Sequence, residues 1–366
     1  MARCNRNGKI EFLRFIFSVI IVIHHSRYVL GDANCKFLGG SFAVEFFFLV
    51  SGYLMMASIE KLSTRKAPGQ GLGKETLGFL WKKAKAVYPE LLIAWIIALI
   101  FTANAQKKSI LGWVALAVDS FYELTLLKMS GLYSTSLNGV TWYISSMLLC
   151  MAILYPLTRK YPDMMKRLGF PLIAVFAMGY LSGEFSNPRD PVKWIGFTMK
   201  GNIRALGEIS LGAVLCVLVK MVENVKLTKL GKIMVTLAEW SAYILLVLYM
   251  YHAKAGQRDY FFLLVMAVAV GISFSHKGID ADMFDNPICV WLGKWSLPLY
   301  LGHTFYAYHL NEVAPKSMTG DQKMAVYMTL AIVTSFAIWG LSVLVKKITP
   351  RIAHILNSLL IDRSDN

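Results

Sequence analysis

The sequence predicts an all-α, polytopic membrane protein with about ten transmembrane helices and both termini in the cytoplasm. Three observations lead to this prediction: the overall composition, the number of long apolar runs and the distribution of basic residues. Of the 366 residues, 56% are hydrophobic and only 16% are charged, and the mean hydropathy is +0.51. Soluble domains carry about 25% charged residues. This composition therefore excludes an ordinary soluble protein.

Ten apolar runs have the length expected of membrane spans, since a transmembrane helix needs about 20 mostly apolar residues. They cover residues 10–30, 40–58, 87–104, 140–157, 169–183, 203–219, 232–251, 259–275, 287–308 and 324–345. The first run follows a basic N-terminus, as in a signal peptide, but it lacks a small-residue cleavage site and is interrupted by Arg14. We expect this helix to be retained.

The basic residues set the predicted orientation. With both termini in the cytoplasm, the inner segments hold most of the 38 Lys and Arg residues, in agreement with the positive-inside rule. The densest inner segment, residues 60–89, leads into the third span. Its positive charge is explained either by attraction to anionic headgroups of the bilayer or by docking of a phosphorylated cytosolic ligand. The net charge of +16 is thus assigned to the membrane or a ligand, and not to nucleic acid.

The domain organisation is simple. We expect one membrane domain over residues 1–346 and a short basic cytoplasmic tail over 347–366, so catalysis would take place within the helix bundle. The two long outer loops, 105–140 and 184–202, are candidates for ligand binding, and the first contains an apolar stretch that suits the membrane interface. The five cysteines are scattered and show no metal-ligand spacing, so neither a metal site nor a disulfide is predicted.

Ionisable residues in the first span are the first candidates for function. Arg14 and His25 are 11 residues apart in the expected helix. This spacing turns the helix to within about 20° of three full turns, so the two side chains share a face. It also separates them by a rise of about 16 Å along the helix. His24 points about 100° away. Arg14 lies near the cytoplasmic boundary and His25 in the outer half. The alternative is that Arg14 extends to the inner headgroups and that His25 bonds a neighbouring helix.

The second span contains Glu45 in an otherwise apolar helix. A buried carboxylate needs a partner, and we expect a histidine or arginine of the first span to supply it. Glu45 would then either belong to a structural salt bridge or orient His25. The adjacent Ser51 and Gly52 predict a close helix approach.

Five segments together resemble the membrane-bound acyltransferase family 3. They are LRFIFSVIIVIHH, GGSFAVEFFFLVSGYLM, TWYISSMLLCMAILYP, RALGEISLG and LGKWSLPLYLGH, in this order along nearly the whole chain. The resemblance implies a ten-helix enzyme of the cell membrane, the cytoplasmic membrane of a bacterium. It also implies transfer of an acyl group, usually acetyl from cytosolic acetyl-CoA, to a hydroxyl of a cell-surface or lipid-linked glycan.

The resemblance also assigns residues. The family's Arg-then-His motif matches Arg14 and His25, and a recurrent histidine late in the chain matches His303. An Arg-x-x-Arg motif before the third span corresponds to Lys83 and Ala86, which departs from the family pattern. Lysine contacts phosphate as a point charge without the bidentate geometry of arginine. This departure leaves a succinyl donor open as an alternative to acetyl.

The candidate site combines these residues with others of the inner helices. We expect His25 to deprotonate the acceptor hydroxyl or to take the acyl group first. Arg204 could bind substrate or form a salt bridge with Glu208 one turn on, and Trp142 is either a substrate platform or part of an interfacial aromatic belt. The predicted catalytic residues are His25, Glu45 and Arg14; those for the donor are Arg14, Lys82, Lys83 and Lys85; those for the acceptor are Trp142, Arg204 and His303.

A different class of protein also fits intramembrane Arg, His and Glu residues, namely a transporter or flippase of a lipid-linked sugar. Such carriers tend to contain internal repeats and paired broken helices. The sequence shows no convincing repeat. An acyltransferase is therefore the favoured prediction.

Overall fold

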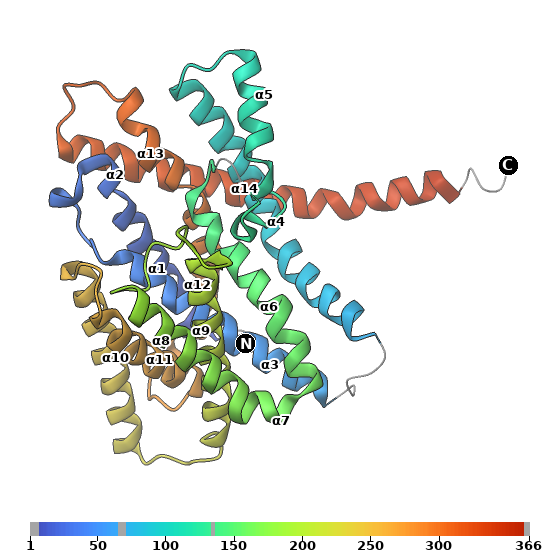
Figure 1. Cartoon of the computed structure of the whole chain (residues 1–366), viewed down its shortest axis with the longest axis vertical. Helices are drawn as coiled ribbons and strands as arrows, with labels where there is room; N and C mark the ends of the chain where they lie inside the picture. The colour runs from blue at the N-terminus through green and yellow to red at the C-terminus, as the bar shows by residue number, and fades with distance from the viewer. Residues whose placement is uncertain (1–6, 65–70, 133–135, 362–366) are drawn as a thin grey trace.

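The computed structural model describes residues 7–64, 71–132 and 136–361, with side chains described as far as residue 349. Helices dominate this part of the chain (Figure 1). The strands assigned within it, β1 (Trp194–Ile195) and β2 (Thr198–Met199), form one short antiparallel pair with Trp194 opposite Met199. The predicted all-α membrane fold is confirmed.

Within the described residues, nine helical segments are long and apolar enough to cross a membrane. They contain α1 (Gly8–His25) with α2 (Arg27–Leu30), α3 (Val44–Ser63), α4 (Leu72–Ala105), α6 (Trp142–Lys160), α7 (Pro162–Met164) with α8 (Phe170–Glu184), α9 (Lys200–Met221), α10 (Lys229–His252), α11 (Arg258–Ser275) and α14 (Gly320–Ile361). Shorter helices are α5 (Ile110–Asp119), α12 (Pro287–Leu301) and α13 (Thr304–Val313). Single turns are η1 (Asp32–Asn34), η2 (Gly40–Ala43), η3 (Phe121–Glu123), η4 (Lys128–Ser130), η5 (Gly139–Thr141), η6 (Met165–Gly169, a π-turn) and η7 (Ala281–Met283).

The ninth predicted span, residues 287–308, corresponds to α12 and α13, which are separated by a break at Gly302 and His303. Helix α12 runs parallel to α1, because Gly293 packs against Glu11 near the start of α1 and His303 lies beside His25 at its end. It therefore passes through the same depth of the bundle as α1. Pro298 lies inside α12 and cannot donate a backbone hydrogen bond, which favours the helix ending soon after it.

Helix α14 runs antiparallel to α1. Near its start the Tyr327 hydroxyl donates to the carbonyl of Val22, and near residue 346 its Lys346 pairs with Glu90 of α4. The start of α1 and the later part of α14 consequently lie at one end of the bundle, which we call the inner end; the opposite end, where α1 finishes, is the outer end. Helix α14 continues past the predicted domain boundary at 346, so the boundary remains a prediction.

The centre of the bundle is a close crossing of α3 and α9, at the position where Ser51 and Gly52 predict a close helix approach. A methyl group added at Gly52 would lie 2.0 Å from the carbonyl oxygen of Ile209, and one at Gly212 would lie 2.1 Å from that of Leu49. Each glycine thus allows the other helix's backbone to approach. This close crossing fixes α9 against α3 and with it the polar residues that both helices carry.

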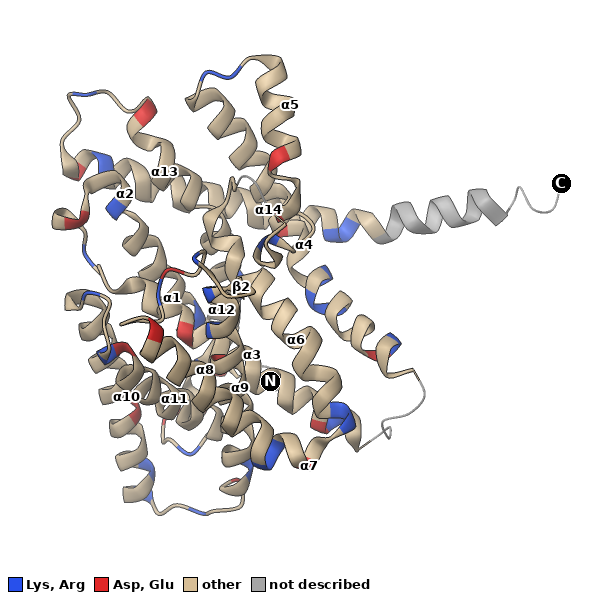
Figure 2. Ribbon diagram, viewed as in Figure 1, with Lys and Arg blue, Asp and Glu red and all other residues tan. Residues whose placement is uncertain are grey.

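Charged residues lie mainly at helix ends and in loops, while the middle of the bundle is largely uncharged (Figure 2). The first outer loop projects as α5 next to the end of α4 (Figure 1). Helix α5 has no buried residue, and Ile110 and Leu111 are 87% and 79% exposed. Its apolar surface is compatible with the predicted placement at the membrane interface, which stays a prediction.

Candidate active site

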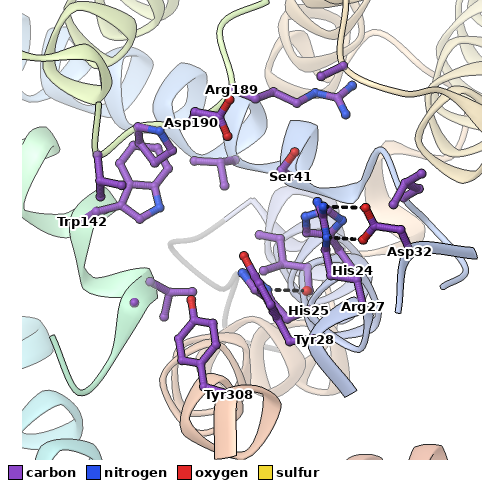
Figure 3. Close-up of a pocket in the computed structure, with 18 of the residues that line it drawn as sticks. His24, His25, Arg27, Tyr28, Asp32, Ser41, Trp142, Arg189, Asp190 and Tyr308 are labelled. Carbon is purple, nitrogen blue, oxygen red and sulfur yellow. Dashed lines mark hydrogen bonds and ion pairs between the residues drawn. The ribbon is translucent and has the colours of Figure 1, made fainter. Parts of the chain in front are cut away.

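A cavity of about 950 Å³ opens at the outer end of the bundle, and we call it the outer cavity (Figure 3). The end of α1 and the connections that follow α1, α4, α8 and α10 contribute to its wall, together with Tyr300 of α12 and Tyr308 of α13. Its polar and aromatic lining consists of His24, His25, Arg27, Tyr28, Asp32, Ser41, Lys128, Ser136, Trp142, Arg189, Asp190, Arg204, Lys254, Tyr300 and Tyr308. Residues that are far apart in the sequence are thereby gathered around His25.

The imidazole of His25 is held by two neighbours. Its Nδ1 lies 2.9 Å from the carbonyl oxygen of Ile21 and 3.1 Å from Nε2 of His303. The Nδ1 of His303 in turn lies 3.2 Å from the carbonyl oxygen of Leu299. Two histidines from opposite ends of the chain therefore meet beside the outer cavity.

These contacts define the tautomer of both rings. A carbonyl oxygen only accepts hydrogen bonds, so Nδ1 of each histidine carries the proton that is donated to Ile21 or Leu299. When His303 is neutral, its Nε2 accepts a hydrogen bond from Nδ1–H of His25, which is then shared between His303 and the carbonyl of Ile21. Nε2 of His25 is left with a lone pair, and no bond to it is found within the described part of the chain. This nitrogen is available as a base.

His303 is positioned by the break between α12 and α13. It precedes the first residue of α13 and is fully buried. Asn138, from the outer loop before α6, donates to the carbonyl of Leu301 on one side of the break and accepts from the hydroxyl of Thr304 on the other. The side chain of Asn138 thus bridges the two helices that flank His303.

His24 also reaches the outer cavity, contrary to the expectation that it points away from the site. Its Nδ1 bonds to the carbonyl oxygen of Phe37, and its side chain packs against the backbone of Gly40. The helical-face argument is wrong on this point, because the cavity is wide enough to include two neighbouring positions of α1. The tight packing leaves His24 a structural role in the loop that follows α1.

The expected partner of Glu45 is also wrong. Glu45 binds Arg204 of α9 through two close contacts, one of them 2.8 Å from Nε, instead of a residue of α1. Arg204 also bonds Glu208 at 3.1 Å, which is the predicted salt bridge one turn on, and its guanidinium lies 5.4 Å from the ring of Trp142. Glu45 and Glu208 are fully buried, so the sequence alone could not show which cation faced them.

A second cavity of about 180 Å³ lies deeper in the bundle, and we call it the inner cavity. It runs between α1, α3, α4, α6 and α12, and both Arg14 and Lys83 line it together with Ala86. Lys82 and Lys85 do not line it and are exposed on the surface of α4. Of the four predicted donor-binding residues, the structure therefore brings two together at this cavity.

The two cavities share the lining residues Val44 and Tyr300. These two side chains therefore form a common wall between the cavity lined by Arg14 and the cavity lined by His25. Arg14 also lies 3.6 Å from Glu11, which is near the start of α1. Arg14 and His25 thus lie at the inner and the outer cavity, respectively.

Comparison with known protein families decides the class of protein. A family profile described as an acyltransferase domain matches residues 7–344, which include every residue that lines the two cavities. The chain belongs to acyltransferase family 3. No match was found among curated proteins or among solved structures. The protein is therefore a multi-pass membrane acyltransferase, and its candidate site is the one formed by the two cavities.

The acyltransferase also has cavity residues that sequence reasoning missed. Tyr28 packs against Tyr308 with ring centroids 4.9 Å apart, and Arg27 forms a two-point ion pair with Asp32 (Figure 3). Lys128 and Arg189 come from the two long outer loops. Loop length was the signal that could have found the last two, whereas nothing in the sequence distinguishes Tyr28 from other tyrosines near helix ends.

A buried pair stabilises the first of these loops in the acyltransferase. Glu123 accepts hydrogen bonds from the backbone N–H of Asn138 and from the hydroxyl of Ser136, and it lies 3.5 Å from the ammonium of Lys128. Burial raises the pKa of Glu123 and lowers the pKa of Lys128. These contacts assign Glu123 and Lys128 to the structure of the loop.

Proposed function

We propose that this acyltransferase moves an acyl group, acetyl in the first place, from coenzyme A to a hydroxyl of a cell-surface or lipid-linked glycan. The observation that carries the proposal is the position of His25. Its Nε2 is free for proton transfer at the outer cavity, and the inner cavity with its two cations shares the lining residues Val44 and Tyr300 with the outer one. A bacterial cytoplasmic membrane suits such a reaction, with donor and acceptor approaching from opposite sides.

The donor is assigned to the inner end. Arg14 and Lys83 place two positive charges at the inner cavity, where the phosphates of coenzyme A need them. Lys82 and Lys85 add surface charge on the same helix and so favour the approach of an anionic donor. The 11 residues from Arg14 to His25 correspond to a rise of about 16 Å, a distance suited to the extended pantetheine arm.

The acceptor is assigned to the outer cavity. The rings of Tyr28, Tyr308 and Trp142 offer flat apolar faces for a sugar ring, and the carboxylate of Asp32 and the guanidinium of Arg27 can bond its hydroxyls. Aromatic faces with a few directed polar groups are the usual lining of a small-molecule site. Because Arg204 also lines this cavity, its charge is available near the acceptor, while Glu45 and Glu208 hold it in place.

The proposed reaction is a direct acyl transfer. Nε2 of His25 takes the proton of the acceptor hydroxyl as its oxygen attacks the thioester carbon. The carbon–sulfur bond breaks, and coenzyme A leaves as a thiol with the proton that His25 gives back. The products are the sugar ester and free coenzyme A. His303 keeps the Nδ1 proton of His25 in place and thereby keeps Nε2 unprotonated.

The test uses the purified protein in liposomes with labelled acetyl-CoA supplied at the inner end and a glycan extract at the outer end. We expect His25→Ala to lower donor consumption by about 10²- to 10⁴-fold, the usual contribution of a general base. His252→Ala is the matched control, because His252 lies exposed at the end of α10. Equal consumption by His25→Ala and the unaltered protein would exclude this role.

Two further measurements define the substrates. Succinyl-CoA in place of acetyl-CoA tests the acyl group, since Lys83 and Ala86 replace the two arginines of the family motif. Mass spectrometry of surface glycans from cells with and without the gene identifies the acceptor through an acyl group that is lost. An unchanged acyl content in every glycan would contradict the proposed acceptor class.

A further inference from the structure

Tyr300 occupies the boundary between the inner and outer cavities. It lines both of them, and the ring contacts Phe47 and Tyr143 at centroid distances of 6.4 and 6.3 Å on the inner side. On the outer side its ring lies 6.2 Å from that of His303, the neighbour of His25. The side chain therefore lies between the donor cavity and the candidate base.

The position of this ring is defined by one hydrogen bond. The Tyr300 hydroxyl donates to the carbonyl oxygen of Val140 at 2.8 Å. Val140 itself lines the outer cavity, so the tether draws the ring across the junction. Tyr300 lies near the end of α12, two residues after Pro298 and two before Gly302, where a helical backbone hydrogen bond is missing and the helix ends. The ring thus has one polar anchor and lies close to the end of its helix.

We propose that Tyr300 is the partition of the transfer route: its ring separates the donor cavity from the outer cavity until an acyl donor displaces it. The shared wall of the two cavities consists of Val44 and Tyr300 among the described residues, and the tyrosine has the larger side chain of the two. Excluding water protects a reactive intermediate from side reactions. A thioester waiting in the inner cavity is then kept from water that enters the outer cavity.

This role rests on the proposed function, but its central test does not require activity. Ser18 lines the inner cavity, and its hydroxyl makes no hydrogen bond within the described residues, so Ser18→Cys is a mild change that reports on this space. A small, charged, membrane-impermeant methanethiosulfonate is added to the outer side of sealed cells. Peptide mass spectrometry then measures labelling at position 18 separately from the native cysteines.

We expect no label at position 18 while Tyr300 is present and clear labelling in the Ser18→Cys, Tyr300→Ala protein. Tyr300→Phe keeps the ring and should remain protected, which separates the bulk of the side chain from its hydrogen bond. Tyr327→Ala is the matched control: its hydroxyl also donates to a backbone carbonyl, that of Val22, and it lines neither cavity. This control should leave position 18 protected.

Three results would overturn the proposal. They are labelling from outside with Tyr300 in place, protection that persists in Tyr300→Ala, and equal labelling in Tyr327→Ala, which would indicate general loosening of the bundle. A second arm measures acetyl-CoA hydrolysis without acceptor, which we expect to rise severalfold in Tyr300→Ala. If the unaltered protein consumes no donor at all, the proposed function fails, whereas the labelling result still decides whether Tyr300 is a partition.

Discussion

Nε2 of His303 lies 3.1 Å from Nδ1 of His25, although 278 residues separate them in the chain. Because both Nδ1 atoms donate to backbone carbonyls, this contact fixes the orientation of His25 and leaves its Nε2 unprotonated. The same logic holds for catalytic histidines in which a partner on one nitrogen determines the basicity of the other. His303 is thus a positioning residue in the proposed mechanism.

Replacing His303 tests this relationship. A general base contributes about 10²- to 10⁴-fold to rate, and we expect His303→Ala to lose part of that factor in kcat with little change in the donor KM. His303→Gln should recover part of the loss, because its side-chain oxygen can accept the Nδ1 proton of His25. Steady-state kinetics of the two variants provide the comparison. Equal activity of His303→Ala and the unaltered protein would remove His303 from the site.

Lys83 provides a test of the donor cavity, and Lys85, two residues further along the same helix, provides a control. Lys83→Ala should raise the KM for acetyl-CoA by about 10- to 100-fold, since a hydrogen bond to a charged group contributes about 1.5–3 kcal/mol. Lys85→Ala removes an exposed lysine of the same helix that does not line the cavity, and its KM should change far less. Equal effects would mean that net charge, and not the cavity contact, binds the donor.

The sequence was sufficient to predict the fold class and nine of the ten proposed spans, because hydropathy and length are local properties that each helix carries on its own. It was weaker for α12 and α13, where Pro298 and Gly302 divide one predicted span into two helices. A break of this kind depends on a partner such as Asn138, which comes from a distant loop. Local pattern alone contains no such information.

The site was predicted in the same uneven way. Ionisable residues in apolar helices are conspicuous, so His25, Glu45, Arg204 and His303 could be selected from the sequence. The pairs that these residues form could not be predicted, because contacts between helices depend on how the helices cross. The partner of Glu45 was therefore expected on the wrong helix. The crossing of α3 and α9 at Gly52 and Gly212 is what brings Glu45 to Arg204.

This crossing makes a prediction about stability. Gly52→Ala would place a methyl group 2.0 Å from the carbonyl oxygen of Ile209, so the helices must separate. We expect a loss of about 1–3 kcal/mol or more, seen as a lower unfolding temperature in detergent. Gly340→Ala in α14 is the control, since no atom lies within 4 Å of its added methyl group. An equal effect at both positions would mean that helix propensity, and not the crossing, is responsible.

The buried pair of Glu123 and Lys128 makes a prediction about pH. Burial raises the pKa of Glu123, while the nearby Lys128 lowers it. Lys128→Met removes the ammonium and leaves a buried carboxylate without its cation, which costs about 3–5 kcal/mol at neutral pH. The pKa of Glu123 then rises further in the folded variant, whereas in the unfolded chain it stays near its ordinary value of about 4.3.

The direction of the pH effect follows from proton uptake. Between the two pKa values of Glu123 the folded variant binds a proton that the unfolded chain does not, so the stability of Lys128→Met increases as the pH falls. We therefore expect its unfolding temperature to be furthest below that of the unaltered protein at about pH 8 and to recover part of the difference at about pH 5.5. Lys108→Met, which removes an exposed lysine of the same outer connection, should show no such pH-dependent difference. A deficit that is constant with pH would show that Glu123 does not take up the proton.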